Sequence, residues 1–176
     1  MLSIYIGPMF SGKTTTLINM FNENKSNNKI IIDYNITNNE YNSNEILESH
    51  NKIKVSCIKC RDFETFELNN NIINIDTIYI NEAQFFPDLF EFVSKMLNFN
   101  KNIYIYGLDG DYKRNKIGYI LDLIPLCDEI FKLKGKCYIC KNKSLFSKRL
   151  TDSNEQYVPD EKQYIPLCRS CFDETY

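Results

Sequence analysis

The chain has 176 residues, of which 43 % are hydrophobic and 25 % are charged, and its formal net charge is -2. This length suits one domain, or one domain with a small appendage, and the composition is that of an ordinary globular protein. The slightly acidic balance argues against a binder of nucleic acid, and no apolar run is long enough to span a membrane.

The first predicted elements form a phosphate-binding motif. The apolar run 2–6 predicts a strand, and a stretch with helical spacing follows Gly7-Pro8-Met9-Phe10-Ser11-Gly12-Lys13-Thr14. The pattern G-x-x-x-x-G-K-[ST] between a strand and a helix is typical of the loop that binds nucleotide phosphates through inward-turned backbone N–H groups. We expect Lys13 to reach the β- and γ-phosphates and Thr14 to ligate Mg²⁺. The alternative, a strand–helix turn that binds nothing, is less consistent with this context.

The chain then alternates predicted strands and helices. Apolar runs predict strands at 29–34, 53–55, 78–80, 102–106 and 129–133. Helices are predicted after the loop, at 63–68 with Asp62 as N-cap, after Pro87-Asp88, and as one turn at 120–124. The asparagine-rich segment 37–48 reads as a polar loop, and we interpret the lone His50 as a solvated residue rather than a base.

This alternation predicts a parallel α/β sheet with ligands at the carboxyl ends of its strands. The glycine-rich loop, Glu82 and Asp109 each follow a predicted strand, so we expect them to meet in one active site. Glu82 is interpreted as a catalytic carboxylate rather than a solvated strand end. Asn81 stands where a metal-side Asp is expected, and it adds no negative charge.

The seven cysteines comprise two C-x-x-C pairs near the C-terminus, one further pair and one single residue. Cys137 and Cys140 form one C-x-x-C pair and Cys168 and Cys171 a second, with 27 residues between the pairs, which predicts a closed structural Zn²⁺ site. Cys57 and Cys60 have no second pair nearby, so they are interpreted as incidental or, alternatively, redox-sensitive. Cys127 is expected in the core. Because no signal peptide precedes the first strand, we expect a cytoplasmic protein with reduced thiols, in the host cytoplasm if viral.

Two further features stay open from the residues alone. Lys148 and Arg149 are either surface charges or phosphate contacts. Tyr112 follows Leu108-Asp109-Gly110 at the expected site, where an aromatic ring could stack on a base.

Several blocks in the same order resemble the type II thymidine kinases, the cellular and poxvirus-type family. They are the loop 7–14, the segment 82–88 (EAQFFPD), Leu108-Asp109-Gly110 with Tyr112 and Arg114, the segment 147–150 (SKRL), and the two cysteine pairs. The resemblance spans nearly the whole chain. It implies a P-loop (RecA-like) parallel sheet flanked by helices over 1–134, and a small zinc-ribbon and lasso subdomain over 135–176.

The resemblance also implies a function. It implies transfer of the γ-phosphate of ATP to the 5′-hydroxyl of thymidine, in a homotetramer with Mg²⁺ and a structural Zn²⁺. It implies small-molecule partners, with dTTP as a candidate feedback inhibitor, and no nucleic acid or membrane partner. Glu82 is implied as general base and Tyr112 as the ring against thymine. The remaining implied substrate contacts are Met9, Phe85, Leu108, Tyr164 and the family's "lasso", here Glu155, Gln156, Tyr157, Val158 and Pro159.

The chain departs from the family pattern at three places. Asn81 replaces an Asp, the segment 38–41 (NNEY) replaces Asp-x-Arg-Tyr, and Tyr157–Asp160 replaces a Gly-Gly pair in the lasso. Pro159 has no N–H to donate to a base. Two alternatives therefore stay open: a kinase for another deoxynucleoside, and a nucleotide-binding protein of the same fold with decayed catalysis. A zinc-ribbon nucleic-acid binder is disfavoured by the acidic balance.

Overall fold

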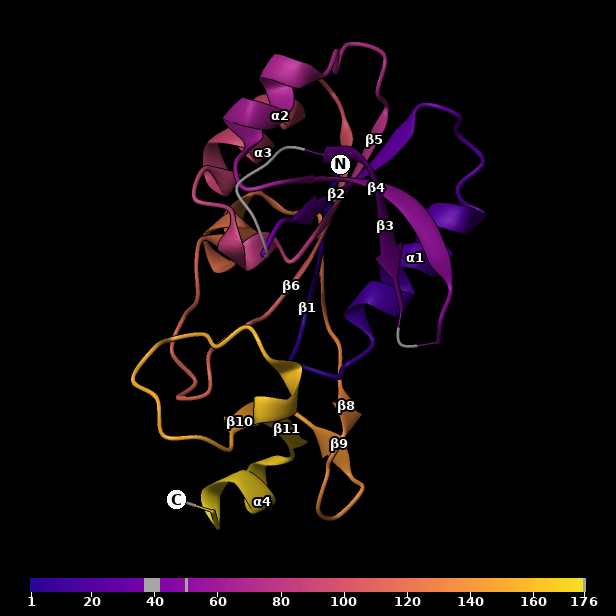
Figure 1. The fold of residues 1–176 in the computed structure, drawn as a ribbon. Helices are drawn as coiled ribbons and strands as arrows, with labels where there is room; N and C mark the ends of the chain where they lie inside the picture. The colour runs from indigo at the N-terminus through magenta and orange to yellow at the C-terminus, as the bar shows by residue number, and fades with distance from the viewer. Residues whose placement is uncertain (37–41, 50, 176) are drawn as a thin grey trace.

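The computed structural model describes residues 1–36, 42–49 and 51–175. Its centre is a seven-stranded sheet in the order β3-β4-β2-β5-β6-β1-β7 (Figure 1). The strands are β1 (Leu2–Ile6), β2 (Lys29–Tyr34), β3 (Asn42–Glu48), β4 (Lys54–Cys60), β5 (Thr77–Asn81), β6 (Asn102–Gly107) and β7 (Glu129–Lys132). Among the residues that the structure describes, no helix has the length and apolar character that crossing a membrane requires.

The sheet is parallel except at one edge. All neighbouring strands from β4 to β7 run parallel, and every residue of β1 and β5 is buried. Continuous apolar runs such as Ile30-Ile31-Ile32 suit strands that are covered on both faces. The predicted α/β class with a mostly parallel sheet is therefore confirmed.

The prediction of a polar loop over 37–48 is wrong for the residues that the structure describes. Residues 42–48 form β3, which pairs antiparallel with β4 and places Leu47 opposite Val55. Leu47 is buried against the core, so one apolar residue with backbone pairing to β4 suffices for a strand in a polar segment. The family departure at 38–41 and the interpretation of His50 lie outside the described residues.

Helices cover both faces of the sheet (Figure 1). On one face, α1 (Lys13–Glu23) buries Leu17 and Ile18 against Tyr79 and Tyr106. On the other, α2 (Phe63–Asn69) and α3 (Leu89–Asn98) pack their aromatic and aliphatic side chains into the larger core cluster. The Asp62 carboxylate accepts a hydrogen bond from Thr65 N at 2.7 Å and caps α2, as predicted. The predicted turn at 120–124 is part of a 3₁₀ helix, η2 (Ile120–Leu126).

Short elements follow β7 at one end of the molecule (Figure 1). They are β8 (Gly135–Lys136), β9 (Lys143–Ser144), β10 (Phe146–Arg149), η3 (Glu161–Gln163), β11 (Tyr164–Leu167) and α4 (Arg169–Asp173). Leu167 and Phe172 form a small core there with Cys137 and Cys171. Ser147 Oγ accepts a hydrogen bond from Met9 N at 2.8 Å, which ties β10 to the glycine-rich loop.

All seven cysteines are free thiols. Cys57 and Cys60 are buried in the two separate core clusters, and burial raises the pKa of each thiol to about 12. Because the thiolate is the reactive form, the redox-sensitive alternative is not supported. Cys127 is half-buried at the margin of the core rather than inside it, and its thiol donates to the Ile124 carbonyl.

Candidate active site

The glycine-rich loop joins β1 to α1 at the carboxyl edge of the sheet. Gly12 has φ 80°, a left-handed conformation that glycine adopts without strain. The Lys13 ammonium is buried and donates to the carbonyls of Gly7 at 3.3 Å and Pro8 at 2.8 Å. Burial lowers the pKa of Lys13, while the charges of the nearby carboxylates, Glu82 first among them, oppose that shift. The loop therefore holds a partly desolvated cation whose backbone acceptors an anion can replace.

Glu82 follows β5 directly, and it lines the same cavity as the glycine-rich loop. Its backbone is left-handed, with φ 51° and ψ 38°, which is costly for a residue with a side chain. The Gln84 amide fixes the carboxylate, because its Nε2 donates to Glu82 Oε2 at 2.7 Å and its Oε1 accepts from Leu108 N at 3.0 Å. A Cβ at Gly107 would lie 2.4 Å from that oxygen, so glycine there makes room for the bridge. Gln84 is thus a site residue that sequence reasoning missed.

A buried polar pair stands beside Glu82. Asn81 Nδ2 donates to Asp33 Oδ1 at 2.8 Å, and both residues are almost fully buried. Burial raises the pKa of Asp33 to about 6, although the Asn81 hydrogen bond lowers it. Asp33 and Asn81 offer oxygen atoms of the kind that Mg²⁺ binds, and so does the half-buried Thr14, which lines the cavity.

A cavity of about 810 Å³ is lined by the glycine-rich loop and by Glu82, while Asp33 and Asn81 are not part of its lining. Its walls are the loop and first turn of α1, the residues Glu82, Leu108, Tyr157 and Glu161, and part of the turn between β3 and β4. Its size is that of a small-molecule site. The cavity therefore brings the predicted phosphate loop, the predicted base and part of the lasso together.

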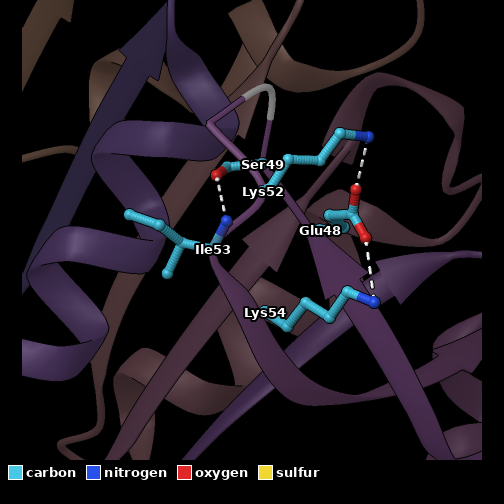
Figure 2. Close-up of polar contacts among 5 residues, drawn as sticks. All are labelled: Glu48, Ser49, Lys52, Ile53 and Lys54. Carbon is cyan, nitrogen blue, oxygen red and sulfur yellow. Dashed lines mark hydrogen bonds and ion pairs between the residues drawn. The ribbon is translucent and has the colours of Figure 1, made fainter.

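The turn between β3 and β4, whose polar contacts are drawn in Figure 2, lines part of the cavity, which sequence reasoning missed. Glu48 pairs with Lys52 at 2.8 Å and with Lys54 at 3.3 Å, and Ser49 Oγ accepts from Ile53 N at 3.2 Å. This segment has the polar composition of a loop because it forms a hairpin with charged residues at its surface. Glu48 and Lys52 line the cavity, and Lys54 is exposed.

Arg149 organises the lasso, the segment Glu155–Pro159. Its buried guanidinium donates to the carbonyls of Ser153, Glu155 and Gln156 and to the Tyr164 hydroxyl. It also lies 3.8 Å from the centre of the Tyr112 ring. In this structure Arg149 is therefore neither a surface charge nor a phosphate contact, while Lys148 bonds to the Thr175 carbonyl near the C-terminus.

The predicted substrate residues lie in two groups. Met9, Leu108 and Tyr157 line the cavity, and the Phe85 ring packs 4.5 Å from the Tyr157 ring. Burial raises the pKa of Tyr157, and the charge of Glu82, which lines the same cavity, adds to that shift.

The second group lies outside the cavity lining. Tyr112 donates to the Ser153 carbonyl, Val158 N donates to the Tyr164 hydroxyl, and Pro159 is exposed. Asp109, expected at the same site, forms an ion pair with Lys132 at 2.7 Å.

The four cysteines of the two pairs converge. The sulfur atoms of Cys137, Cys140, Cys168 and Cys171 all lie within 4.8 Å of one another. A tetrahedral zinc with Zn–S bonds of about 2.3 Å needs sulfurs at this range of separation. Burial opposes ionisation of Cys137, but backbone N–H groups of Cys168, Cys140 and Ile139 lower its pKa to about 6. Burial, together with the neighbouring Cys140 and Cys168 thiols, raises the pKa of Cys171 to about 12, so the cluster favours a thiolate at Cys137 and not at Cys171.

Comparison with known proteins finds thymidine kinases that match nearly the whole chain. A family model described as thymidine kinase matches residues 1–172. Thymidine kinase 1 of Dictyostelium discoideum is 33 % identical over 177 residues, which cover 98 % of this chain and 77 % of that protein. The thymidine kinase of Yaba monkey tumor virus is 35 % identical over 176 residues, 97 % of this chain and 93 % of that protein. The Amsacta moorei entomopoxvirus thymidine kinase is 33 % identical over 180 residues, 99 % of each.

Proposed function

The chain belongs to the thymidine kinase family and is an enzyme that phosphorylates thymidine, and from this premise we propose that ATP is the phosphoryl donor and Glu82 the general base. The observation that carries the proposal is the shared cavity, which is lined by Lys13, Thr14 and Glu82. Kinase chemistry needs a phosphate cradle, a cation and a carboxylate beside the acceptor hydroxyl, and the groups that line this cavity would supply them.

The donor half of the site is the loop 7–14, which we propose is a P-loop. Its backbone N–H groups would hold the phosphates of ATP, and the Lys13 ammonium would leave the Gly7 and Pro8 carbonyls to bind them. Thr14 would hold Mg²⁺, which neutralises charge on the phosphates when bound. The negative charge that develops during transfer would thus be met by groups already in place.

The acceptor half begins at Glu82. We propose that its carboxylate accepts the proton of the thymidine 5′-hydroxyl as the oxygen attacks the γ-phosphate. The Gln84 bridge holds this carboxylate in one position, so little reorganisation is needed at the moment of transfer. Leu108 and Tyr157 then border the space left for the nucleoside.

The lasso is proposed to close over the thymine base, with Tyr112, Phe85 and Tyr164 as flanking rings. Its main support is the Arg149 network, which holds the lasso backbone in one conformation. A closed lasso would exclude water, which competes with thymidine for the phosphoryl group.

The remaining parts of the proposal follow from the cysteine cluster and from the likeness to the family. We propose a kinase domain at 1–134 and a zinc and lasso subdomain at 135–176, with Zn²⁺ on the four cysteines. A homotetramer, feedback inhibition by dTTP and a cytoplasmic location are proposed by likeness to the family. A reducing compartment would keep the four thiols available for zinc.

The proposed donor is tested by incubating the purified protein with radiolabelled ATP and thymidine, beside deoxyuridine, deoxycytidine and deoxyguanosine. We expect ATP-dependent formation of thymidine monophosphate, which Lys13→Ala abolishes. Turnover of thymidine that Lys13→Ala leaves intact would contradict the proposed P-loop. Preference for another nucleoside would trace to the lasso, where Pro159 departs from the family pattern.

A further inference from the structure

The carboxyl edge of the sheet has an amide where the site needs a charge. Asn81 ends β5 immediately before Glu82, at the position where a carboxylate beside the metal is expected. An amide oxygen can accept a hydrogen bond from a metal-bound water, but it contributes no negative charge toward a divalent cation. Asn81 alone therefore leaves the metal side of the site electrostatically incomplete.

The neighbouring strand brings a carboxylate to the same place. β2 pairs with β5 in the register Asp33 opposite Asn81, and Asp33 Oδ1 accepts from Asn81 Nδ2 at 2.8 Å. Both residues are buried, with 6 % of Asp33 and 4 % of Asn81 exposed. Glu82 follows Asn81 in the chain and lines the cavity, and burial first, then the charge of Glu82, raises the pKa of Asp33. A buried carboxylate thus stands one strand away from the expected position.

The hydrogen bond also sets the orientation of the amide. An ionised Asp33 can only accept, so the Asn81 amide must turn its Nδ2 toward it. The Asn81 oxygen is then the atom left to accept, and it has no hydrogen-bond partner among the residues that the structure describes. On the other side of Asp33, Lys59 of β4 approaches Oδ2 at 3.7 Å, beyond hydrogen-bond distance and from a partly exposed position. Besides the Tyr34 backbone and this more distant ammonium, the side chain that hydrogen-bonds to Asp33 is Asn81.

We propose that Asp33 is the positioning residue of the metal side of this site: it supplies, through the Asn81 amide, the negative charge that a carboxylate at position 81 would carry. This inference rests on the proposed binding of a magnesium nucleotide to the loop 7–14. Asp33 orients and polarises the Asn81 oxygen toward the water shell of the cation, and it does not contact the nucleoside. Within this row of residues the carboxylate thus stands on β2 and the amide on β5.

The test is the affinity of Mn²⁺, used as a spectroscopic substitute for Mg²⁺, for the protein–ADP complex, measured by electron paramagnetic resonance. Outer-shell partners of metal sites typically contribute 10- to 100-fold in affinity, so Asp33→Asn is expected to weaken Mn²⁺ binding by about 10- to 100-fold. The double variant Asp33→Asn with Asn81→Asp returns the charge to β5, and we expect it to restore affinity to within about threefold of the starting protein. Asp128→Asn is the matched control, because Asp128 accepts from Leu2 N at the opposite edge of the sheet.

The outcomes separate the possible roles of Asp33. Unchanged Mn²⁺ affinity in Asp33→Asn would overturn the proposal, since a purely structural role leaves the metal unaffected. Loss of affinity that the double variant does not recover would also overturn it. ADP binding without Mn²⁺, measured by calorimetry, checks the loop itself. If the starting protein does not bind ADP, the proposed donor site fails and the inference about Asp33 fails with it.

Discussion

Replacing Arg149 with Met removes the centre of the lasso network while keeping an unbranched side chain of similar length. Only 6 % of Arg149 is exposed. Its guanidinium donates to the carbonyls of Ser153 at 3.1 Å, Glu155 at 2.5 Å and Gln156 at 3.0 Å, and to the Tyr164 hydroxyl at 2.8 Å. A hydrogen bond from a charged donor contributes about 1.5–3 kcal/mol, but bonds to one guanidinium are not additive.

The lasso carbonyls can bind water once the segment opens, which returns part of the lost energy. We therefore expect the ordered lasso to lose about 3 kcal/mol relative to open forms, a factor of roughly 100 in that local equilibrium. If only the ordered form binds nucleoside, the KM for thymidine should rise by about 10- to 100-fold, depending on how stable the lasso is at the outset. The KM for ATP should change less than about threefold, because the loop 7–14 keeps its own contacts.

Steady-state kinetics with each substrate varied in turn measure both constants. The matched control is Arg114→Met, since Arg114 forms an exposed ion pair with Asp173 at 3.1 Å, and such pairs contribute about 0–1 kcal/mol. A KM for thymidine within about twofold of the unmodified protein in Arg149→Met would refute the scaffold role. An equal rise in both KM values would instead indicate general loss of structure, and circular dichroism would detect it.

Two further predictions concern zinc and pH. Cys168→Ser should lower the zinc content measured by atomic absorption from about one ion per chain to near zero and raise the KM for thymidine, because the cluster anchors β11; full zinc content would contradict the site. Burial raises the pKa of Asp33 from 3.8 to about 6. The protonated carboxyl therefore stabilises the folded state relative to an ionised one below about pH 4, and this contribution to stability is lost as the pH rises through 6. The free energy of unfolding of Asp33→Asn minus that of the parent, measured by urea unfolding, should therefore rise by about 3 kcal/mol from pH 4 to pH 7. A difference that does not change with pH would contradict the cost of burying the charged carboxylate.

Much of the sheet could be predicted because its strands are buried on both faces. Ile30-Ile31-Ile32 and Ile78-Tyr79-Ile80 are apolar runs with no competing helical pattern, and the structure places both in central parallel strands. β3 could not be predicted in this way, because its sequence Asn42–Glu48 is mostly polar and, among the side chains described at 45–48, Leu47 alone is buried in the core. Its backbone pairing with β4 decides the conformation, and a single-sequence pattern does not show that pairing.

The residues of the candidate site likewise fall into those that local motifs predict and those that depend on tertiary contacts. The glycine-rich loop and the cysteine pairs are local motifs whose spacing specifies their chemistry, so they were predictable. Gln84 and Arg149 act through partners in other segments: Gln84 bonds to Leu108 N, 24 positions along the chain, and Arg149 bonds to several lasso carbonyls. Asp33 becomes relevant only through its register with Asn81. Gln84 and Arg149 lie in the segments 82–88 and 147–150 that carry the resemblance, but which atoms they bond to depends on tertiary structure.

The most direct test of the central claim is the turnover number of Glu82→Gln with saturating ATP and thymidine. Gln keeps the shape of the side chain but cannot accept the 5′-hydroxyl proton as a carboxylate does, and general-base catalysis contributes about 10²- to 10⁴-fold. We predict that kcat falls by this factor while ADP binding and zinc content stay unchanged. A kcat within about threefold of the parent protein, with thymidine still phosphorylated, would contradict the assignment of Glu82 as the base.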